Sequence, residues 1–384
     1  MSLRQKKILI IYEFFYPAFK AGGIIRSLEN IISKLGNEYD FYIVTGGYDL
    51  GEKFPLMNIK LNEWNTVQIE QSNAKVWYDD KKNSSPSKWK EIIKTVNPDI
   101  VYINGFMHLQ FLLYPLIALQ SFKNIKTIIA PRGMLQKGAI NVKPLKKFLY
   151  LEFIKLAGLT KNMQWHFTSE AEAVEAQKLG WGINSATVIP NLFHKPVSTP
   201  AFLYKEGGII KLVYASIITP KKNLFYLLET LVLCTQQIEL NIYGVIKEKA
   251  YWEDCKRLIS QMPSHIKVQY LGNYHSSDVT DIFVQHHAMI LLSKAENFGH
   301  AIVESLSVGR PVITSEFTSW DHLEAQKAGW NISIDDKLVT ASAIDQIAKM
   351  DNYVFESFYS GALQLANNQY VTKDYVAAYK KLFG

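Results

Sequence analysis

A chain of 384 residues and 43.9 kDa is too long for one ordinary hydrophobic core, so we expect two domains. Apolar residues make up 48% and charged residues 20%, a balance that is typical of a folded protein and argues against long disordered segments. Two cysteines, Cys234 and Cys255, are too few for a disulfide framework or a zinc ribbon.

The basic charge lies in the first half of the chain. Residues 1–195 hold 25 Lys and Arg against 16 Asp and Glu, whereas residues 196–384 hold 17 against 19, for a net charge of +7. Residues 131–161 contribute seven basic side chains and one acidic side chain, Glu152. This segment favours an anionic partner, with a solvated basic surface as an equal alternative, and we expect no nucleic acid.

No segment is long enough to span a bilayer. The apolar run after the basic N-terminus ends at Glu13, and the run at 111–119 is broken by Pro115. Neither approaches the roughly 20 residues that a transmembrane helix needs. We therefore expect a cytoplasmic protein, with peripheral contact to the inner face of the plasma membrane as an additional hypothesis.

Short apolar runs alternate with longer stretches of helical period, which predicts βαβ units and parallel sheets. The predicted strands of the first series are 7–12, 41–46, 99–105, 126–131, 165–169 and 186–190. Those of the second series are 210–216, 239–244, 266–272, 288–293 and 310–315. The predicted fold class is α/β, with two Rossmann-like, doubly wound domains.

A segment without a clear period separates the two series. It contains Pro196, Pro200 and two glycines, which is typical of a linker. We place the first domain at residues 1–195, the linker at 196–208 and the second domain at 209–368.

Ligands of doubly wound sheets bind at the carboxyl ends of the strands, where loops lead into helices. In the first such loop, Gly22 and Gly23 precede a helix with regularly spaced apolar residues. Glycine lets the backbone N–H groups at a helix N-terminus approach a phosphate or a sugar. A flexible loop is the alternative, because the full G-x-G-x-x-G pattern of a nicotinamide site is missing.

The loop after the predicted strand 210–216 contains Lys221 and Lys222 at the start of a helix. Lysine is a poor partner for the positive end of a helix dipole but a good partner for a bound anion. The pair therefore favours a bound diphosphate, and a solvent-exposed lysine pair is the alternative.

The loop in "KAENFGHAIVESLSVGRPVIT" has the most unusual composition. Glu296 follows a predicted strand, and Glu304 falls about one turn inside the next helix, whose N-terminus offers the backbone N–H groups of Phe298, Gly299 and His300. The first carboxylate suits the vicinal hydroxyls of a sugar, and the second suits those of a ribose. Spacing alone also permits two surface glutamates that flank a turn.

The block from Glu296-Asn297-Phe298-Gly299 through "AIVESLSVGRPVITS" resembles the E-x7-E segment of retaining glycosyltransferases of family 4. Their fold, called GT-B, has two Rossmann-like domains that face each other across a cleft. Three other segments match in the same order, "APRGMLQKGAINVKPLKKFLY", "FTSEAEAVEAQKLG" with "ATVIPN", and "ASIITPKKNL". The resemblance spans nearly the whole chain and implies that a final helix near 373–384 packs back on the first domain.

The resemblance implies transfer of a hexose, with retention and without a metal or cofactor, from a nucleotide diphosphate sugar to a polysaccharide or a lipid-linked saccharide. The second domain would bind this donor. Glu296 would hold the donor sugar, Lys222 would neutralise the diphosphate, and Glu304 would bind the ribose. The other implied substrate contacts are Gly22, Gly23, Arg132, Asn273, Tyr274, Asn297, Phe298, Gly299 and His300. The chain contains no D-x-D motif, which disfavours a metal-bound diphosphate.

The sequence departs from the family pattern at two places. Ser216-Ile217 stands where the family usually has an arginine ahead of the lysine, so one diphosphate cation is missing, and Arg132 is a conceivable substitute. Asn104 stands where many members have histidine. Two other functions stay open, a nucleotide-sugar-binding protein with impaired activity and a nucleotide-sugar epimerase. A dehydrogenase has the least support, because neither half carries the full dinucleotide motif.

Apolar side chains are interleaved with the lysines of residues 137–161. This combination predicts salt-sensitive contact with an anionic membrane. The apolar residues concerned are Leu145, Phe148, Leu149 and Phe153.

Overall fold

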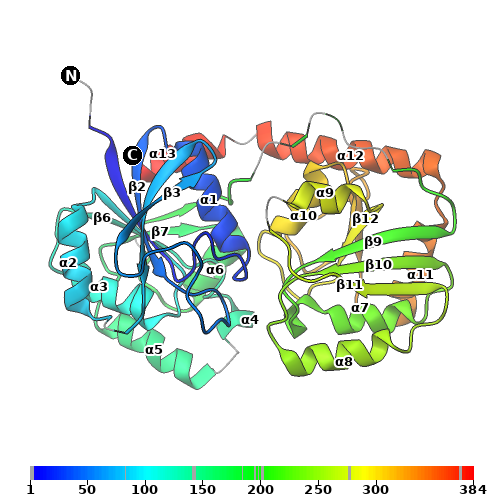
Figure 1. Cartoon of the computed structure of the whole chain (residues 1–384), viewed down its shortest axis with the longest axis horizontal. Helices are drawn as coiled ribbons and strands as arrows, with labels where there is room; N and C mark the ends of the chain where they lie inside the picture. Colours follow the sequence, from blue (N-terminus) through cyan, green and yellow to red (C-terminus); the bar gives the residue numbers. More distant parts are fainter. Residues whose placement is uncertain are drawn as a thin grey trace. The chain divides into compact units, whose positions relative to one another are not determined.

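The computed structural model describes residues 4–82, 84–140, 144–183, 185–193, 196, 197, 199, 203–275, 278–371 and 374–384. Of the predicted features, Lys143, part of the linker and position 373 lie outside these residues. The chain divides into two compact units (Figure 1). The first runs to Leu192 and includes Tyr375–Gly384, and the second comprises Phe193–Asp374.

The sheet of the first unit has the strand order β3-β4-β2-β1-β5-β6-β7-β8 across its described residues. Its strands are β1 (Lys6–Ile11), β2 (Tyr39–Gly46), β3 (Trp64–Ile69), β4 (Ser72–Asp79), β5 (Ile100–Asn104), β6 (Lys126–Ala130), β7 (Gln164–Phe167) and β8 (Ala186–Val188). Neighbouring strands are parallel, except that β3 is antiparallel to β4. β1 pairs with β2 on one side and with β5 on the other, so the winding reverses between β1 and β5.

Successive side chains of β1 enter two different cores, because neighbouring residues of a strand point to opposite faces of the sheet. Ile8 and Ile10 lie in one core and Leu9 and Ile11 in the other. The helices that contribute to the first core are α1 (Gly23–Leu35) and α13 (Tyr375–Phe383). Those that contribute to the second are α2 (Pro86–Val96), α3 (Tyr114–Leu119), α5 (Pro144–Leu156) and α6 (Glu170–Lys178). Two short helices, η1 (Leu109–Leu113) and α4 (Lys137–Ile140), lie in the connections.

The last helix, α13, belongs to the first unit although it is far from that unit in sequence. Lys126 Nζ donates a hydrogen bond to the Leu382 carbonyl at 2.6 Å. The Phe383 ring meets the Tyr39 ring edge-on, with 5.8 Å between the centroids. These contacts anchor the end of the chain on the face that α1 covers.

The sheet of the second unit has the order β11-β10-β9-β12-β13-β14, and each described pair is parallel. The strands are β9 (Ile209–Ala215), β10 (Gln237–Tyr243), β11 (Ile266–Tyr270), β12 (Ala288–Leu291), β13 (Val312–Ser315) and β14 (Gly329–Ile332). The helices are η2 (Pro220–Lys222), α7 (Leu224–Leu231), α8 (Lys249–Ile259), α9 (Val279–Val284), α10 (His300–Ser307), α11 (Lys337–Lys349) and α12 (Asn352–Val371). Figure 1 shows α7 and α8 on one face of this sheet and α9 and α10 on the other.

The two parallel-sheet α/β domains confirm the predicted fold class, and the predicted strands coincide with observed ones. Three strands were not predicted, namely β3, β4 and β14. In β4 the buried positions include Ser72 and the exposed ones include Asn73 and Lys75, so the strand has alternating burial without an apolar run. β14 spans four residues, which is too short for a periodic signal.

The end of the predicted linker packs on the second unit. Lys205 is fully buried, and its Nζ donates to the carbonyls of Glu206, Ala348 and Met350 at 3.0, 2.7 and 3.0 Å. The last two carbonyls lie at the end of α11, where a cation is favoured by the helix dipole. Among the described residues, no helix combines the length and the apolar character needed to cross a bilayer.

Candidate active site

The winding of the second sheet reverses between β9 and β12, which pair with each other. Ligands of doubly wound folds bind outside the carboxyl ends of strands at such a reversal. The loops that follow these two strands are hydrogen-bonded together, because Lys221 O accepts from Lys294 N at 2.9 Å and from Ser293 Oγ at 3.2 Å. The sequence motifs with Lys222 and Glu296 lie on these two loops.

Lys222 Nζ and a carboxylate oxygen of Glu296 form an ion pair between the loops. The side chains are 20% and 14% exposed, so the pair is mostly shielded from solvent but still accessible. The backbone of each partner is fixed. The Tyr214 hydroxyl donates to Lys222 O at 3.3 Å, and Glu296 N donates to Phe317 O at 3.0 Å. The loops therefore hold a cation and an anion at one place.

Gly299 forms the N-cap of α10 in the left-handed region, with φ 71° and ψ 64°. A Cβ at this position would lie 2.9 Å from Ile302 Cδ1 and 3.3 Å from Glu296 Cγ, so glycine also lets the Glu296 side chain pass. Gly299 itself has no side chain that could cap this helix. The Phe298 carbonyl accepts from Trp320 Nε1 at 2.7 Å, which fixes the turn. A helix N-terminus thus begins next to the Lys222–Glu296 pair.

The remaining motif residues of the second unit lie on α10 and after β11. Glu304 is half-buried one turn inside α10, and the rings of Phe298 and His300 have centroids 4.8 Å apart. Asn273 is exposed, and the Tyr274 ring meets Tyr243 edge-on at 6.1 Å. Because β10 separates β11 from β9, Asn273 and Tyr274 lie beside the site at a greater distance along the sheet edge.

The turn that contains Ile217 packs closely against the end of β10. Gly244 has a φ of 145°, and a Cβ there would lie 1.8 Å from Ser216 O, so only glycine fits. Ser216 N donates to Tyr243 O at 3.0 Å, and Ile218 N donates to Val245 O at 2.8 Å. The backbone turn is therefore firmly held although the usual arginine is missing from it.

The family model described as glycosyl transferases group 1 matches residues 203–353, which include both site loops and α10. The second unit is thus similar to group 1 glycosyl transferases over most of its length. No curated protein sequence matches the chain.

Solved structures similar to the whole chain have the same two-domain architecture. Alr3699/HepE of Anabaena, in complex with UDP and glucose, has a TM-score of 0.68 and 15% identity, with 98% of each chain covered. Sucrose-phosphate synthase of Thermosynechococcus elongatus has a TM-score of 0.70 and 14% identity, with 99% of each chain covered. WaaG, a glycosyltransferase involved in lipopolysaccharide biosynthesis, has a TM-score of 0.64 and 13% identity, with 98% of each chain covered. The fold is GT-B, as predicted.

The second unit holds most of the predicted site residues, whereas Gly22, Gly23 and Arg132 belong to the first unit. Gly22 is the N-cap of α1 with φ 84°, and Gly23 is the first residue of that helix. Sequence reasoning missed Asp49, a buried carboxylate that holds the preceding loop. Asp49 accepts from Phe19 N at 3.0 Å and from Lys20 N at 3.2 Å.

The guanidinium group of Arg132 is hydrogen-bonded to other residues of the first unit. Its Nε donates to Asn104 Oδ1 at 2.9 Å, one terminal nitrogen donates to Asn191 Oδ1 at 2.5 Å, and the other donates to the Tyr102 hydroxyl at 2.8 Å. Each guanidinium nitrogen already has a protein partner, which disfavours Arg132 as the substitute for the missing diphosphate cation.

The network around Arg132 continues to a buried histidine. The Tyr102 hydroxyl is 2.7 Å from His166 Nδ1, and His166 Nε2 is 2.8 Å from the Ile189 carbonyl. Burial, and to a lesser degree the Arg132 charge, lower the pKa of His166 to about 3. His166 is therefore neutral at physiological pH and serves as a structural part of the first core.

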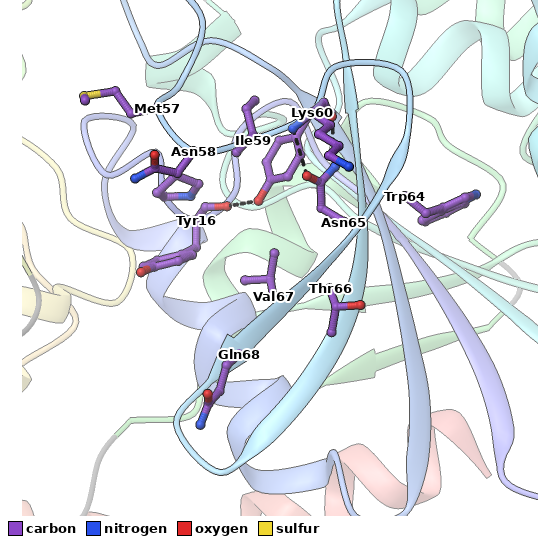
Figure 2. Close-up of a pocket in the computed structure, with 12 residues that line it drawn as sticks. Tyr16, Met57, Asn58, Ile59, Lys60, Trp64, Asn65, Thr66, Val67 and Gln68 are labelled. Carbon is purple, nitrogen blue, oxygen red and sulfur yellow. Dashed lines mark hydrogen bonds between the residues drawn. The ribbon is translucent and has the colours of Figure 1, made fainter.

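A cavity of about 520 Å³ opens on the first unit beside the edge strand β3 (Figure 2). Tyr16, Asn58, Trp64 and Gln68 are among its lining residues, and none of the residues that the sequence motifs single out lines it. The amide of Asn65 is engaged by the Lys60 backbone at 2.8 and 2.9 Å. The cavity therefore adds no support to the predicted donor site.

No group of three or more His, Cys, Asp or Glu side chains among the described residues is arranged to hold a metal ion. Lys222 and Glu296, the charged groups that meet between the two loops, already form a pair. The chemistry that these residues offer is electrostatic stabilisation by a cation and hydrogen bonding by a carboxylate.

Proposed function

We propose that the protein transfers a hexose from a nucleotide diphosphate sugar to a polysaccharide or a lipid-linked saccharide, as a family 4 type glycosyltransferase. The observation that carries the proposal is the Lys222–Glu296 pair beside the N-terminus of α10, at the point where the second sheet reverses its winding. This pair lies inside the region that matches glycosyl transferases group 1.

The charges of the pair match the two halves of such a donor. A diphosphate carries negative charge that Lys222 can neutralise, and this charge grows as the glycosidic bond breaks. A sugar offers vicinal hydroxyls to the Glu296 carboxylate. Glu304 on α10 is assigned to the ribose, and the backbone of Asn297, Phe298, Gly299 and His300 is assigned to the donor. The solved complexes of Alr3699/HepE with UDP and UDP-glucose make a uridine donor the first to test.

The mechanism that we propose is retaining and metal-independent. Lys222 and the backbone N–H groups at the start of α10 are positioned before the reaction and stabilise the departing diphosphate. Glu296 positions the donor sugar. The test of retention is the anomeric configuration of the product by NMR, and the test of metal independence is unchanged turnover in the presence of a chelator. An inverted product or loss of turnover to the chelator would contradict the respective part.

The acceptor that we propose is presented at an anionic membrane surface. Helix α5 carries apolar side chains that are more than half exposed and recur on one helical face, namely Leu145, Phe148, Leu149, Phe153 and Leu156. Lys146, Lys147 and Lys155 flank them. Exposed apolar area beside basic charge is typical of helices that bind anionic lipid interfaces.

Vesicle flotation tests this membrane contact. The wild type is expected to float with vesicles that contain phosphatidylglycerol at low salt and to be released at high salt. Phe148→Ser with Phe153→Ser should abolish flotation, whereas Phe54→Ser, which changes an exposed phenylalanine elsewhere on the first unit, should not. Absence of flotation at low salt would contradict the membrane proposal and leave the donor chemistry unaffected.

The donor is tested by a screen of nucleotide diphosphate sugars, beginning with UDP-glucose, on the wild type and on Glu304→Gln. Thermal stabilisation, release of the nucleoside diphosphate and loss of both in the variant are expected. The exposed Glu356→Gln on α12 is the matched control and should behave like the wild type. Stabilisation without turnover would favour the alternative that Ile217 raises, a nucleotide-sugar-binding protein with impaired activity.

A further inference from the structure

The first unit has its own reversal of winding, between β1 and β5, and three titratable side chains meet at the carboxyl ends of the strands there. Glu13 follows β1, His108 follows β5 and Lys81 follows β4. Glu13 Oε1 is 3.2 Å from His108 Nε2 and 3.0 Å from Lys81 Nζ. The three side chains are between 27% and 31% exposed, so a ligand can reach them.

The orientation of His108 is fixed by the helix that it caps. Its Nδ1 accepts from Gln110 N at 3.1 Å and from Phe111 N at 3.2 Å, at the start of η1. The ring proton is therefore assigned to Nε2, which donates to Glu13. The Tyr150 hydroxyl donates to His108 O at 3.0 Å. These contacts hold His108 in an orientation in which Nε2 faces Glu13.

Two features of the backbone allow the Lys81 side chain to reach Glu13. Lys81 has a φ of 64°, which is unfavourable for a residue with a side chain, and its N–H donates to Asp79 Oδ1 at 2.6 Å. Gly46 at the end of β2 leaves the path open, since a Cβ there would lie 2.8 Å from Lys81 Cε and 2.9 Å from Glu13 O. The positive φ of Lys81 and the absence of a side chain at Gly46 together place the Lys81 ammonium group beside Glu13.

An ordinary surface ion pair does not explain this arrangement, because such pairs contribute little to stability. Both donors bind Oε1, and Oε2 of Glu13 has no hydrogen-bond partner in the part of the chain that the structure describes. Burial favours the neutral acid, but the hydrogen bond from His108, together with the charge and hydrogen bond of Lys81, outweighs it and lowers the pKa of Glu13. The result is an ionised, fixed carboxylate with one open oxygen at the reversal point of the sheet.

We infer that Glu13 binds a hydroxyl group of the acceptor saccharide through Oε2, with His108 and Lys81 as the residues that position it. This inference rests on the proposed transferase function and names its acceptor-side site. The Lys81 charge balances that of Glu13, so the site suits a neutral hydroxyl better than a phosphate or a carboxylate. The substrate class at this position is a neutral sugar residue of the acceptor.

The test is direct binding of a neutral saccharide probe without donor. Octyl β-D-glucoside, kept below its micelle concentration, is titrated into the full-length protein and followed by saturation-transfer difference NMR. The wild type is expected to bind it, and Glu13→Gln is expected to weaken binding at least tenfold. Glu38→Gln is the matched control, since Glu38 also pairs with a lysine, Lys380, on the surface of the first unit. It should bind as the wild type does.

A second variant and a second ligand separate the possible failures. Lys81→Met should weaken the probe severalfold without removing the carboxylate, and thermal stabilisation by UDP-glucose, a property of the second unit, reports on the intact fold. Equal binding of the probe by Glu13→Gln and wild type, or no binding by the wild type, would overturn the inference. If UDP-glucose does not raise the melting temperature of the wild type, the proposed donor function is contradicted. The role of Glu13 is still decided by the binding of the saccharide probe.

Discussion

Replacement of Gly299 by alanine should damage the donor site more than it damages the fold. The left-handed backbone at Gly299 costs an alanine about 1–2 kcal/mol of folding free energy. The new methyl group would lie 2.9 Å from Ile302 Cδ1, a flexible tip that can turn away, and 3.3 Å from Glu296 Cγ. A shift of Glu296 by a few tenths of an ångström weakens, without removing, a charge-assisted hydrogen bond worth about 1.5–3 kcal/mol, so donor affinity should fall severalfold, up to about tenfold.

The assay pairs denaturant unfolding with calorimetric titration of UDP-glucose, or of the donor that the screen identifies. Gly180→Ala is the matched control, because Gly180 has a φ of 70° and a Cβ there would meet nothing within 4 Å. Both variants should lose similar stability, and only Gly299→Ala should lose donor affinity. Unchanged affinity in Gly299→Ala, with the expected loss of stability, would refute the assignment of this turn to the donor.

Three further predictions concern charge. Lys222→Met should reduce donor affinity by about tenfold to a hundredfold, because one charge-assisted contact to the diphosphate is lost. Calorimetric titration measures this change, and unchanged affinity would contradict the assignment of Lys222 to the diphosphate. Lys205→Met should lower the unfolding free energy of the second unit by about 1–3 kcal/mol, measured with denaturant, because it leaves buried carbonyls unpaired. The pKa of His166 is about 3 in the folded protein and about 6.5 in the unfolded chain. Its contribution to the free energy of unfolding is therefore complete above about pH 6.5. Between about pH 6.5 and pH 3 this contribution falls by about 1.4 kcal/mol per pH unit, because only the unfolded chain binds the proton. His166→Asn should remove that part of the slope, and an unchanged slope would show that other groups dominate.

The sequence predicted the strands that contain an apolar run and missed strands that are very short or whose run is interrupted by polar residues. β1 and β12 are apolar almost throughout because both faces of a parallel sheet are covered by helices. The edge pair β3 and β4 has exposed positions at every second residue, and its polar side chains conceal the strand. The edge formed by β3 and β4 was therefore missed, whereas the centre of the first sheet and its other edge strand, β8, were predicted.

The candidate sites divide in a similar way. The donor motif was visible because Glu296, Gly299 and Glu304 lie within one short segment at the end of a strand. The group of Glu13, Lys81 and His108 comes from three separate loops and has no spacing that a motif could capture. Its assembly depends on the order of the strands, which the sequence alone does not state.

The hydrogen-bond partners of Arg132 could not be predicted from the sequence either. Arg132 had the right charge for a diphosphate, but three acceptors within the first unit occupy its guanidinium group. Two of these, Asn104 and Asn191, are remote from Arg132 in the chain, and no pattern in the sequence linked them to it. A charge read from a motif indicates a cation, and only the fold shows which anion or dipole it contacts.

The central claim is that the second unit binds a nucleotide diphosphate sugar at the Lys222–Glu296 pair. The most direct measurement is calorimetric titration of UDP-glucose and other nucleotide diphosphate sugars, with chelator present, into the wild type and Glu296→Gln. Binding of one donor by the wild type, weakened at least tenfold in the variant, is predicted. Equal binding by both proteins would show that the donor site lies elsewhere, and no binding of any donor would contradict the transferase account.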